Sequence, residues 1–437
     1  MKTWKLIIIA ALIVIIPLAL AFLISYQTKP TASYERHVEE VMNMEQTDLD
    51  SPISGIRTGV YRDVTSLGNN EFECTDDGVY YMADTLPGMY DMTGEGNKKT
   101  EGYNDFIFFC PHDSDTMIKL CGRPDCTHDS PKCNAAFFGG VIGGITYYDG
   151  HLYVITRFDD PLWMPTLWRM NPDGSGREAV LRVSSIVEGD KQYMGCGSPS
   201  FQNGVFEAGL LYGVEDGYAK GCDWVYCKLD GKSNKLKFTD RPTGSNDGFA
   251  MLCGSQQAPD GTIDGNWHLY QWDPDTDTQE HLVQTPEEDR YLDCYWGADA
   301  GYYFENGNVI KVNYPDGDKS VLFETGLTGR YTAKFYPDCI AMLEFKERSP
   351  ENPGMMYFYS WEGEKLGEVA IGVNNEVSNS LFGGESKDRI MLRGGFDTSL
   401  PEYYIEKSDF GTGHIELHKF KYPDLDEDTY RQLFGED

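Results

Sequence analysis

The stretch Thr166–Arg182, TLWRMNPDGSGREAVLR, decides the fold of this chain of 437 residues. Two apolar runs, in which inward and outward side chains alternate, flank the polar segment Asn171–Gly176. Glycine adopts positive φ angles without steric cost, and aspartate caps a turn with its side chain. Asp-Gly between two such runs is therefore a strong signal for two antiparallel strands joined by a tight turn.

The same unit recurs along the chain. Each copy has two apolar-aromatic runs around Asp-Gly or an equivalent turn, and the copies are Asp105–Cys121, Thr166–Arg182, Asp223–Phe238, His268–Val283, Asn308–Phe323, Met355–Ile371 and Tyr403–Phe420. Two further strands precede several of these hairpins, as in GITYYDGHLYV at Gly144–Val154. The later turns are spaced by about 40 to 50 residues, which is the repeat length of propeller blades.

A four-stranded sheet cannot bury both of its faces alone, but a ring of such sheets stacks face on face. We therefore predict an all-β fold, a β-propeller that covers residues 70–420. Seven four-stranded blades fit this range best, and six or eight are the alternative counts. The aromatic content of 13% and the 47 glycines agree with a chain rich in strands and turns.

The two ends of the predicted propeller are less regular. Residues 27–69 are predicted to form a juxtamembrane stalk and a lead-in strand, and residues 421–437 an acidic C-terminal tail. This tail either forms a short helix against the edge of the propeller or stays loose. A strand from Gly55–Val64 that pairs with the last blade is an alternative way to close the ring.

The N-terminal segment predicts a membrane anchor. Lys2 and Lys5 precede an apolar run from Leu6 to Ile24. Nineteen residues at about 1.5 Å each are just long enough to span a hydrocarbon core of about 30 Å. The positive charges keep the N-terminus in the cytoplasm, so residues 1–26 form a transmembrane signal anchor and the propeller is extracytoplasmic. The alternative is a cleaved signal peptide, with Ala19–Ala21 as the cleavage site, and a secreted protein.

The charge of the chain excludes one class of partner. The sequence has 37 Lys and Arg residues against 70 Asp and Glu residues, a net charge of -33. A nucleic-acid-binding protein needs a basic surface to neutralise phosphates, and none is visible in the sequence. We therefore expect no nucleic acid as a partner.

The hairpin Leu167–Gly176, LWRMNPDGSG, resembles the repeats of the TolB-type and related WD-like propellers of bacteria. With its N-terminal anchor, the whole chain is similar to exported propeller proteins of anaerobic gut Firmicutes. The resemblance covers residues 70–420 and implies the fold. Proteins of such folds mostly bind proteins or glycans, and only some are enzymes, so the resemblance implies no particular activity.

A cluster of cysteines follows the first hairpin. The segment Leu120–Ala135, LCGRPDCTHDSPKCNA, contains Cys121, Cys126, His128 and Cys133. We expect it to connect the outer strand of the first blade to the inner strand of the second, on a loop where function tends to lie. Three thiolates and one imidazole are adequate ligands for tetrahedral zinc, although their spacing departs from the usual zinc motifs.

Three interpretations of this cluster stay open. With Cys110 the cysteines make an even set, and an exported chain lies where disulfides persist, so disulfides or simple structural thiols are the first. A structural zinc ion is the second, and a redox-responsive centre is the third. The total of 11 cysteines is odd, so at least one thiol stays unpaired if all the others form disulfides.

Two tryptophans are the other candidate binding residues. Trp163 and Trp168 lie in FDDPLWMPTLW, an insertion with two prolines. As exposed aromatic residues, they would stack on a sugar or anchor a partner. The alternative is that these side chains pack between blades.

No catalytic motif is legible in the sequence. It contains neither a G-x-S-x-G elbow nor an H-E-x-x-H helix. We therefore predict that the chain is a membrane-anchored extracytoplasmic propeller that acts as a binding or scaffold module. An enzymatic function is less favoured. One alternative is an exported polysaccharide hydrolase or lyase that uses carboxylates on one propeller face. The other is a Cys/His module that responds to a metal or to redox state.

Overall fold

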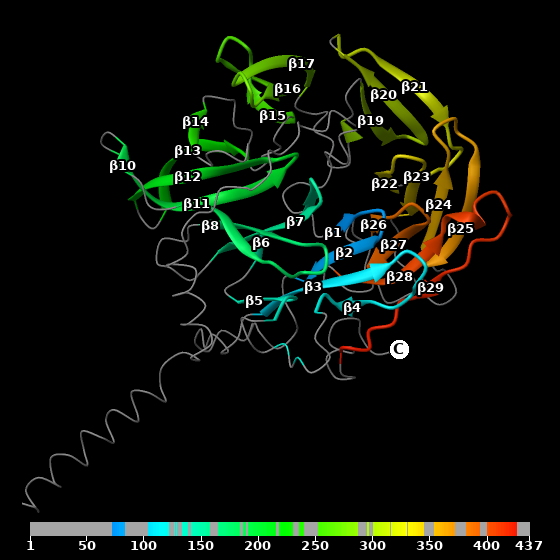
Figure 1. Cartoon of the computed structure of the whole chain (residues 1–437). Coiled ribbons are helices and arrows are strands. Elements are labelled where there is room, and N and C mark those ends of the chain that lie inside the picture. Colours follow the sequence, from blue (N-terminus) through cyan, green and yellow to red (C-terminus); the bar gives the residue numbers. More distant parts are fainter. Residues whose placement is uncertain are drawn as a thin grey trace, which may run out of the picture.

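The structure is a computed structural model, and it describes most of the predicted propeller. The described residues are 72–83, 104–121, 126, 128, 133–138, 141–157, 165–183, 187–188, 191–215, 218–229, 236–239, 252–286, 295–296, 300–314, 316–329, 331–344, 354–371, 382–393 and 400–425. Figure 1 shows the strands of these residues as small sheets that follow one another around a ring in chain order.

The described residues form seven antiparallel sheets. The first contains β1 (Phe72–Cys74), β2 (Gly78–Ala83), β3 (Asn104–Pro111), β4 (Ile118–Lys119) and β5 (Ala136–Phe138). The second contains β6 (Val141–Tyr148), β7 (His151–Arg157), β8 (Pro165–Met170) and β9 (Glu178–Arg182). The third contains β10 (Val187–Glu188), β11 (Lys191–Gln202), β12 (Val205–Glu215), β13 (Tyr218–Lys228) and β14 (Lys237–Thr239).

The remaining four sheets follow the same order. The fourth contains β15 (Leu252–Gln257), β16 (Ile263–Asp273) and β17 (Thr278–Pro286). The fifth contains β18 (Tyr295–Trp296), β19 (Ala300–Glu305), β20 (Asn308–Asn313) and β21 (Lys319–Glu324). The sixth contains β22 (Tyr331–Phe335), β23 (Ile340–Glu344), β24 (Gly354–Tyr359) and β25 (Lys365–Ile371). The seventh contains β26 (Phe382–Glu385), β27 (Arg389–Arg393), β28 (Pro401–Glu406) and β29 (His418–Lys419), with a short 3-10 helix, η3 (Lys407–Asp409), after β28.

The hairpins predicted from the turn sequences are present. In the second sheet β8 pairs with β9, and Leu167 lies opposite Leu181. Gly174 at the tip has a φ of +77°, and the Asp173 carboxylate accepts a hydrogen bond from the Ser175 N–H at 2.9 Å. An all-β chain of several four-stranded antiparallel sheets fits the predicted β-propeller.

The hydrophobic core lies mainly between neighbouring sheets. Tyr153 of the second sheet packs on Phe201 of the third, with ring centroids 4.4 Å apart. Tyr226 of the third sheet meets Trp272 of the fourth edge-on at 4.8 Å. Because both faces of the inner strands are covered in this way, alternation does not expose every second residue of these strands.

The tips of the hairpins contact the preceding sheet. A methyl group added at Gly317, in the β20–β21 turn of the fifth sheet, would lie 3.0 Å from the Gln284 carbonyl oxygen of the fourth sheet. One added at Gly363, in the β24–β25 turn of the sixth sheet, would lie 2.7 Å from Cβ of Phe323 in the fifth. The Gly411 N–H of the seventh sheet donates to Leu366 O of the sixth at 2.8 Å. These contacts fix how each sheet sits against its neighbour.

The ring closes between the seventh and the first sheets. Arg389 of β27 donates to the carbonyl oxygen of Ser114, which lies in the tip of the first sheet. The main chain of Lys421 bonds to both sides of that tip, since its N–H donates to Asp115 O at 2.8 Å and its C=O accepts from Met117 N–H at 2.8 Å. The Lys421 ammonium also pairs with the Asp115 carboxylate at 2.6 Å.

Residues 421–425, the start of the predicted C-terminal tail, lie on the first sheet. Tyr422 is buried against Phe108 of β3, and its hydroxyl donates to Pro401 O. Residues 421–425 form no helix, and residues 426–437 of the predicted tail lie outside the described residues. The alternative closing strand Gly55–Val64 lies outside the described residues.

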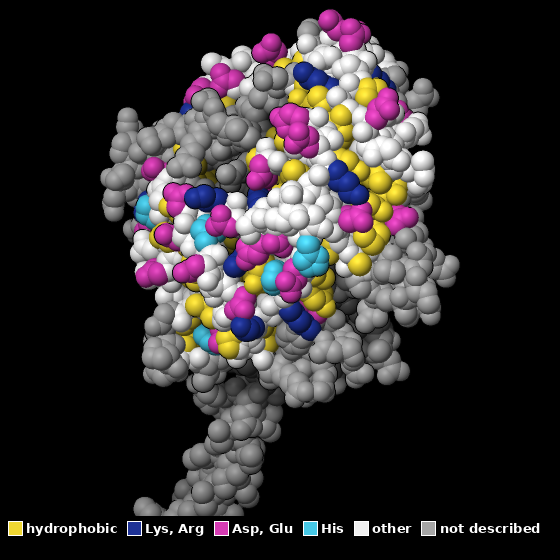
Figure 2. All heavy atoms as spheres, turned by 90° about the vertical axis from the view of Figure 1, so that its right-hand side faces the viewer, with side chains coloured by type: hydrophobic (Ala, Val, Ile, Leu, Met, Phe, Trp, Pro, Cys, Tyr) yellow, Lys and Arg dark blue, Asp and Glu magenta, His cyan; other side chains and the backbone are white. Residues whose placement is uncertain are grey.

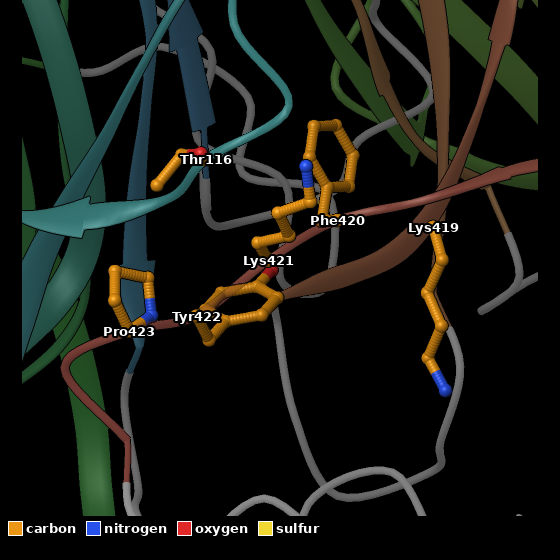
Figure 3. Close-up of a pocket in the computed structure, with 6 residues that line it drawn as sticks. All are labelled: Thr116, Lys419, Phe420, Lys421, Tyr422 and Pro423. Carbon is orange, nitrogen blue, oxygen red and sulfur yellow. The ribbon is translucent and has the colours of Figure 1, made fainter.

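A shallow hollow of about 490 Å³ lies where this segment crosses the first sheet. Figure 3 shows the six residues that line it, Thr116, Lys419, Phe420, Lys421, Tyr422 and Pro423. Its two lysines pair with carboxylates, Lys419 with Glu402 at 3.3 Å and Lys421 with Asp115. The hollow therefore marks the ring closure, and its cations are already neutralised.

No helix among the described residues is long and apolar enough to cross a membrane. The predicted anchor at Leu6–Ile24 and the stalk at residues 27–69 lie outside the described residues.

Charged side chains of both signs lie on the face shown in Figure 2. Figure 2 shows one face of the molecule, on the side of β21, β24 and β25, where acidic side chains are scattered among basic, histidine and hydrophobic ones. On this face the acidic side chains do not gather in a single patch.

Candidate metal centre

The segment Cys121–Cys133 is an excursion from the outer edge of the first sheet. Before it, β4 pairs with the Phe108–Phe109 part of β3, and after it β5 pairs with the Asn104–Phe106 part of the same strand. The segment follows the outer strand β4, as predicted, but the chain adds β5 to the first sheet before it reaches β6 of the second. The chain returns to its own sheet because Ala136–Phe138 fills the half of the β3 edge that β4 leaves open.

The four predicted ligands come together. The ligand atoms of Cys121, Cys126, His128 and Cys133 all lie within 4.8 Å of one another. Nδ1 of His128 is 3.2 Å from Sγ of Cys133. Zinc–sulfur bonds of about 2.3 Å place the sulfurs of a tetrahedral site about 3.8 Å apart, so the ligands need to contract by about 1 Å at most. The described residues of the loop thus form a group that could hold a metal ion.

His128 reaches the group through an unusual backbone conformation. Its φ is +58°, in the left-handed region that few residues other than glycine adopt. The ring of Phe106, at the end of β3 where β5 pairs, meets the imidazole edge-on with a centroid distance of 6.4 Å. Such a conformation persists only where its surroundings hold it, and it is typical of functional sites.

Burial keeps the innermost thiol protonated when no cation is near. Cys133 is 0% exposed, and burial is the main reason that the pKa of its thiol is raised to about 12. The other three ligands are partly buried. A cation at the centre of the group reverses this preference, because a coordinating thiol loses its proton.

The described cysteines are not joined by disulfides. Cys110, the fourth member of the even set, lies apart from the group, and its thiol contacts the carbonyl oxygen of Ser114 at 3.3 Å. Burial raises the pKa of the Cys110 thiol to about 12, and nearby Arg389 lowers it only in part. The described residues of the loop could therefore hold a metal ion, and Cys110 is not part of that group.

The structure decides between the two interpretations of Trp168. Trp168 in β8 is 3% exposed, and its indole N–H donates to the hydroxyl of Thr156 at 2.7 Å. It packs between sheets, as the alternative interpretation held, and does not face a ligand. Trp163 lies outside the described residues.

Sequence reasoning missed one residue that contacts the segment Cys121–Cys133, which we call the metal loop. Arg177, at the start of the second strand of the β8–β9 hairpin, donates to Cys133 O at 3.0 Å and to Ala136 O at 2.7 Å. Its guanidinium lies over the ring of Phe137, 4.6 Å from the centroid. Nothing in the local pattern announces this reach into the first sheet, because an arginine after a hairpin turn is ordinarily solvated.

Sequence reasoning also missed a charged cluster between the sixth and seventh sheets. The ammonium of Lys407 lies 2.7 Å from the Glu385 carboxylate and 2.9 Å from that of Asp338. Burial raises the pKa of Glu385 to about 7, and Asp338 raises it further, while Lys407 lowers it. One cation thus serves two carboxylates at this junction.

Comparisons with known proteins show a likeness of structure alone. No family model and no curated protein sequence matches the chain. Similar solved structures include TolB from Acinetobacter baumannii, with 13% identity over 65% of this chain and 62% of TolB, at a TM-score of 0.31. Another is the acylaminoacyl peptidase of Pyrococcus horikoshii, with 10% identity over 82% of this chain and 53% of the peptidase, at a TM-score of 0.42.

A third similar structure is a putative 6-phosphogluconolactonase from Bacteroides uniformis, with 11% identity over 79% of this chain and 97% of that chain, at a TM-score of 0.34. TolB is thus among the similar structures, as the resemblance of the hairpin sequences predicts. The chain spans less than two thirds of TolB and about half of the peptidase. At these TM-scores the similarities carry no argument about activity, and the fold assignment rests on the sheets themselves.

Proposed function

We propose that the chain is a membrane-anchored, extracytoplasmic, seven-bladed propeller that serves as a binding or scaffold module for a protein or glycan. In this proposal Cys121, Cys126, His128 and Cys133 hold a structural zinc ion that stiffens the loop of the first sheet. The observation that supports it is the convergence of the four ligand atoms within 4.8 Å of one another, on a loop that starts and ends on one sheet. Loops on rigid scaffolds are where binding sites concentrate.

The ligand set favours a structural over a catalytic ion. Three sulfurs and one nitrogen complete a tetrahedral shell, whereas a catalytic zinc site keeps one position open for water or substrate. Stiffening lowers the conformational entropy that a loop loses when it binds a partner, which strengthens binding.

The charge of the chain narrows the ligand class. A net charge of -33 repels acidic polysaccharides and attracts basic partners. We therefore expect a neutral glycan or a protein with a basic surface. The run Leu6–Ile24 behind Lys2 and Lys5 supports the anchor and the extracytoplasmic location.

The metal proposal is tested on the full chain, extracted from membranes in detergent under reducing conditions. Elemental mass spectrometry is expected to find one zinc ion per chain. Cys126→Ser is expected to lose the zinc, whereas Cys222→Ser, a change at an exposed cysteine of the third sheet, is expected to keep it. Zinc retained by Cys126→Ser contradicts the proposed site, as does a wild-type protein in which Cys121 or Cys133 is found in a disulfide.

The binding proposal is tested by affinity electrophoresis in gels that contain neutral or acidic soluble polysaccharides, with reducing ends measured in parallel. Retardation by a neutral polysaccharide without new reducing ends supports a glycan-binding module. New reducing ends support the alternative, a polysaccharide hydrolase or lyase. Digestion of the propeller by protease added to intact cells supports the extracytoplasmic location, and full protection contradicts it.

A further inference from the structure

The metal loop is pinned at both ends by one residue of its own sheet. The Leu120 N–H donates to the carbonyl oxygen of Ile107 at 2.8 Å, and the Ile107 N–H donates to the carbonyl oxygen of Ala135 at 3.0 Å. Ile107 lies in the middle of β3, where the pairing changes from β4 to β5. Cys121 and Cys133 therefore leave the sheet from adjacent points. This explains how ligands far apart in the loop meet.

The second sheet contacts the chain next to both Cys121 and Cys133. Gly174, at the tip of the β8–β9 hairpin, is buried against Leu120 and Asn134, the residues directly before Cys121 and directly after Cys133. A methyl group added at Gly174 would lie 3.1 Å from the Leu120 carbonyl oxygen and 3.1 Å from Asn134 Cβ. Glycine is required here because the φ of +77° and the close approach both exclude a side chain.

Arg177 adds a second contact from the same hairpin. One guanidinium nitrogen donates to Cys133 O and the other to Ala136 O, so the planar group bridges the chain on either side of Asn134 and Ala135. The guanidinium carbon lies 4.6 Å from the ring centroid of Phe137 and 5.9 Å from that of Trp168, and these rings fix the orientation of the guanidinium group. Lysine has a single ammonium and cannot reproduce this two-point contact.

We propose that the metal centre is shared between two sheets, with Gly174 and Arg177 of the second sheet as positioning residues for Cys121 and Cys133 of the first. This inference rests on the proposed zinc site and extends it. Mutation of groups that hold a metal ligand in place typically lowers metal affinity by about 10- to 100-fold. By thermodynamic reciprocity, an ion in the site also strengthens the docking of the β8–β9 hairpin on the first sheet.

The test measures zinc affinity of the full chain by competition with a chromophoric chelator, and the absorption of the cobalt-substituted site. Arg177→Lys and Gly174→Ala are expected to weaken zinc binding by about 10- to 100-fold and to alter the cobalt spectrum. The matched control is Gly317→Ala, which places the same strain at another hairpin tip with a φ of +73°. It is expected to leave zinc affinity and the cobalt spectrum unchanged.

The possible results separate the two proposals. A wild-type chain that binds neither zinc nor cobalt removes the metal site and with it this inference. A wild-type chain that binds zinc, with folded Arg177→Lys and Gly174→Ala variants of unchanged affinity, overturns the shared site alone. If Gly174→Ala does not fold, Arg177→Lys decides, because it keeps the charge and the aliphatic stem of the side chain.

Discussion

Closure of the ring through the C-terminal segment makes a quantitative prediction at Tyr422. This side chain is 6% exposed, packs edge-on against Phe108 at a centroid distance of 6.0 Å, and donates its hydroxyl hydrogen to Pro401 O. It therefore connects β3 of the first sheet with the start of β28 in the seventh. Tyr422→Ala removes the ring and the hydrogen bond together, and leaves a cavity at the junction.

The expected cost follows from the kind of contact that is lost. Truncation of a buried aromatic side chain to alanine lowers the free energy of unfolding by about 3–5 kcal/mol. Tyr422→Phe keeps the ring and loses only the hydrogen bond, which lowers it by about 1 kcal/mol. Lys421→Ala removes an ion pair whose lysine side chain is 68% exposed, so its effect is the smallest of the three.

Urea-induced unfolding of the full chain, followed by intrinsic fluorescence, measures all three variants under one set of conditions. Limited proteolysis supplies a second readout, since an open ring exposes the edges of the first and seventh sheets. The order expected is Tyr422→Ala, then Tyr422→Phe, then Lys421→Ala. A Tyr422→Ala variant within about 1 kcal/mol of the wild type, the size of an ordinary substitution, refutes the closure through this segment.

Three further predictions concern other parts of the molecule. The pKa of Glu385 is raised from 4.5 to about 7 in the folded chain, so its contribution to stability is present below pH 4.5 and is lost as the pH rises to about 7. In urea titrations, Glu385→Gln is therefore expected to gain stability relative to the wild type between pH 5 and pH 8, by at most about 3 kcal/mol. The same difference in unfolding free energy between variant and wild type at both pH values contradicts this. Trp168→Phe leaves the buried Thr156 hydroxyl without the indole donor and is expected to lower the free energy of unfolding by about 1–3 kcal/mol in the same assay. It is expected to leave polysaccharide retardation unchanged, and loss of retardation in a folded variant would restore Trp168 as a binding residue. A strong zinc chelator is expected to lower the thermal midpoint in scanning calorimetry, since an ion at 100 times its dissociation constant contributes about 2.7 kcal/mol, and an unchanged midpoint excludes a structural ion.

The local part of the fold could be predicted from the sequence. Hairpins form between adjacent segments, and turns such as Asp173–Gly174 specify their own geometry. In β13 the two sides of the strand differ, with Cys222 exposed and Cys227 buried.

Contacts between distant segments could not be predicted in this way. The four ligands were named from their chemistry, but the return of Ala136–Phe138 to β3 depends on an edge left open by the short strand β4. Trp168 looked exposed beside a proline-rich insertion, yet the neighbouring sheets cover both faces of β8. Arg177 reaches the first sheet only because the β8–β9 tip docks there. The local sequence does not show which surfaces of the sheets come into contact.

X-ray absorption at the zinc edge of the purified full chain tests the metal centre most directly. The account predicts one zinc ion per chain, with three sulfurs at about 2.3 Å and one nitrogen at about 2.0 Å. A shell of nitrogen and oxygen atoms only, or a chain without zinc whose cysteines are oxidised to disulfides, would contradict it.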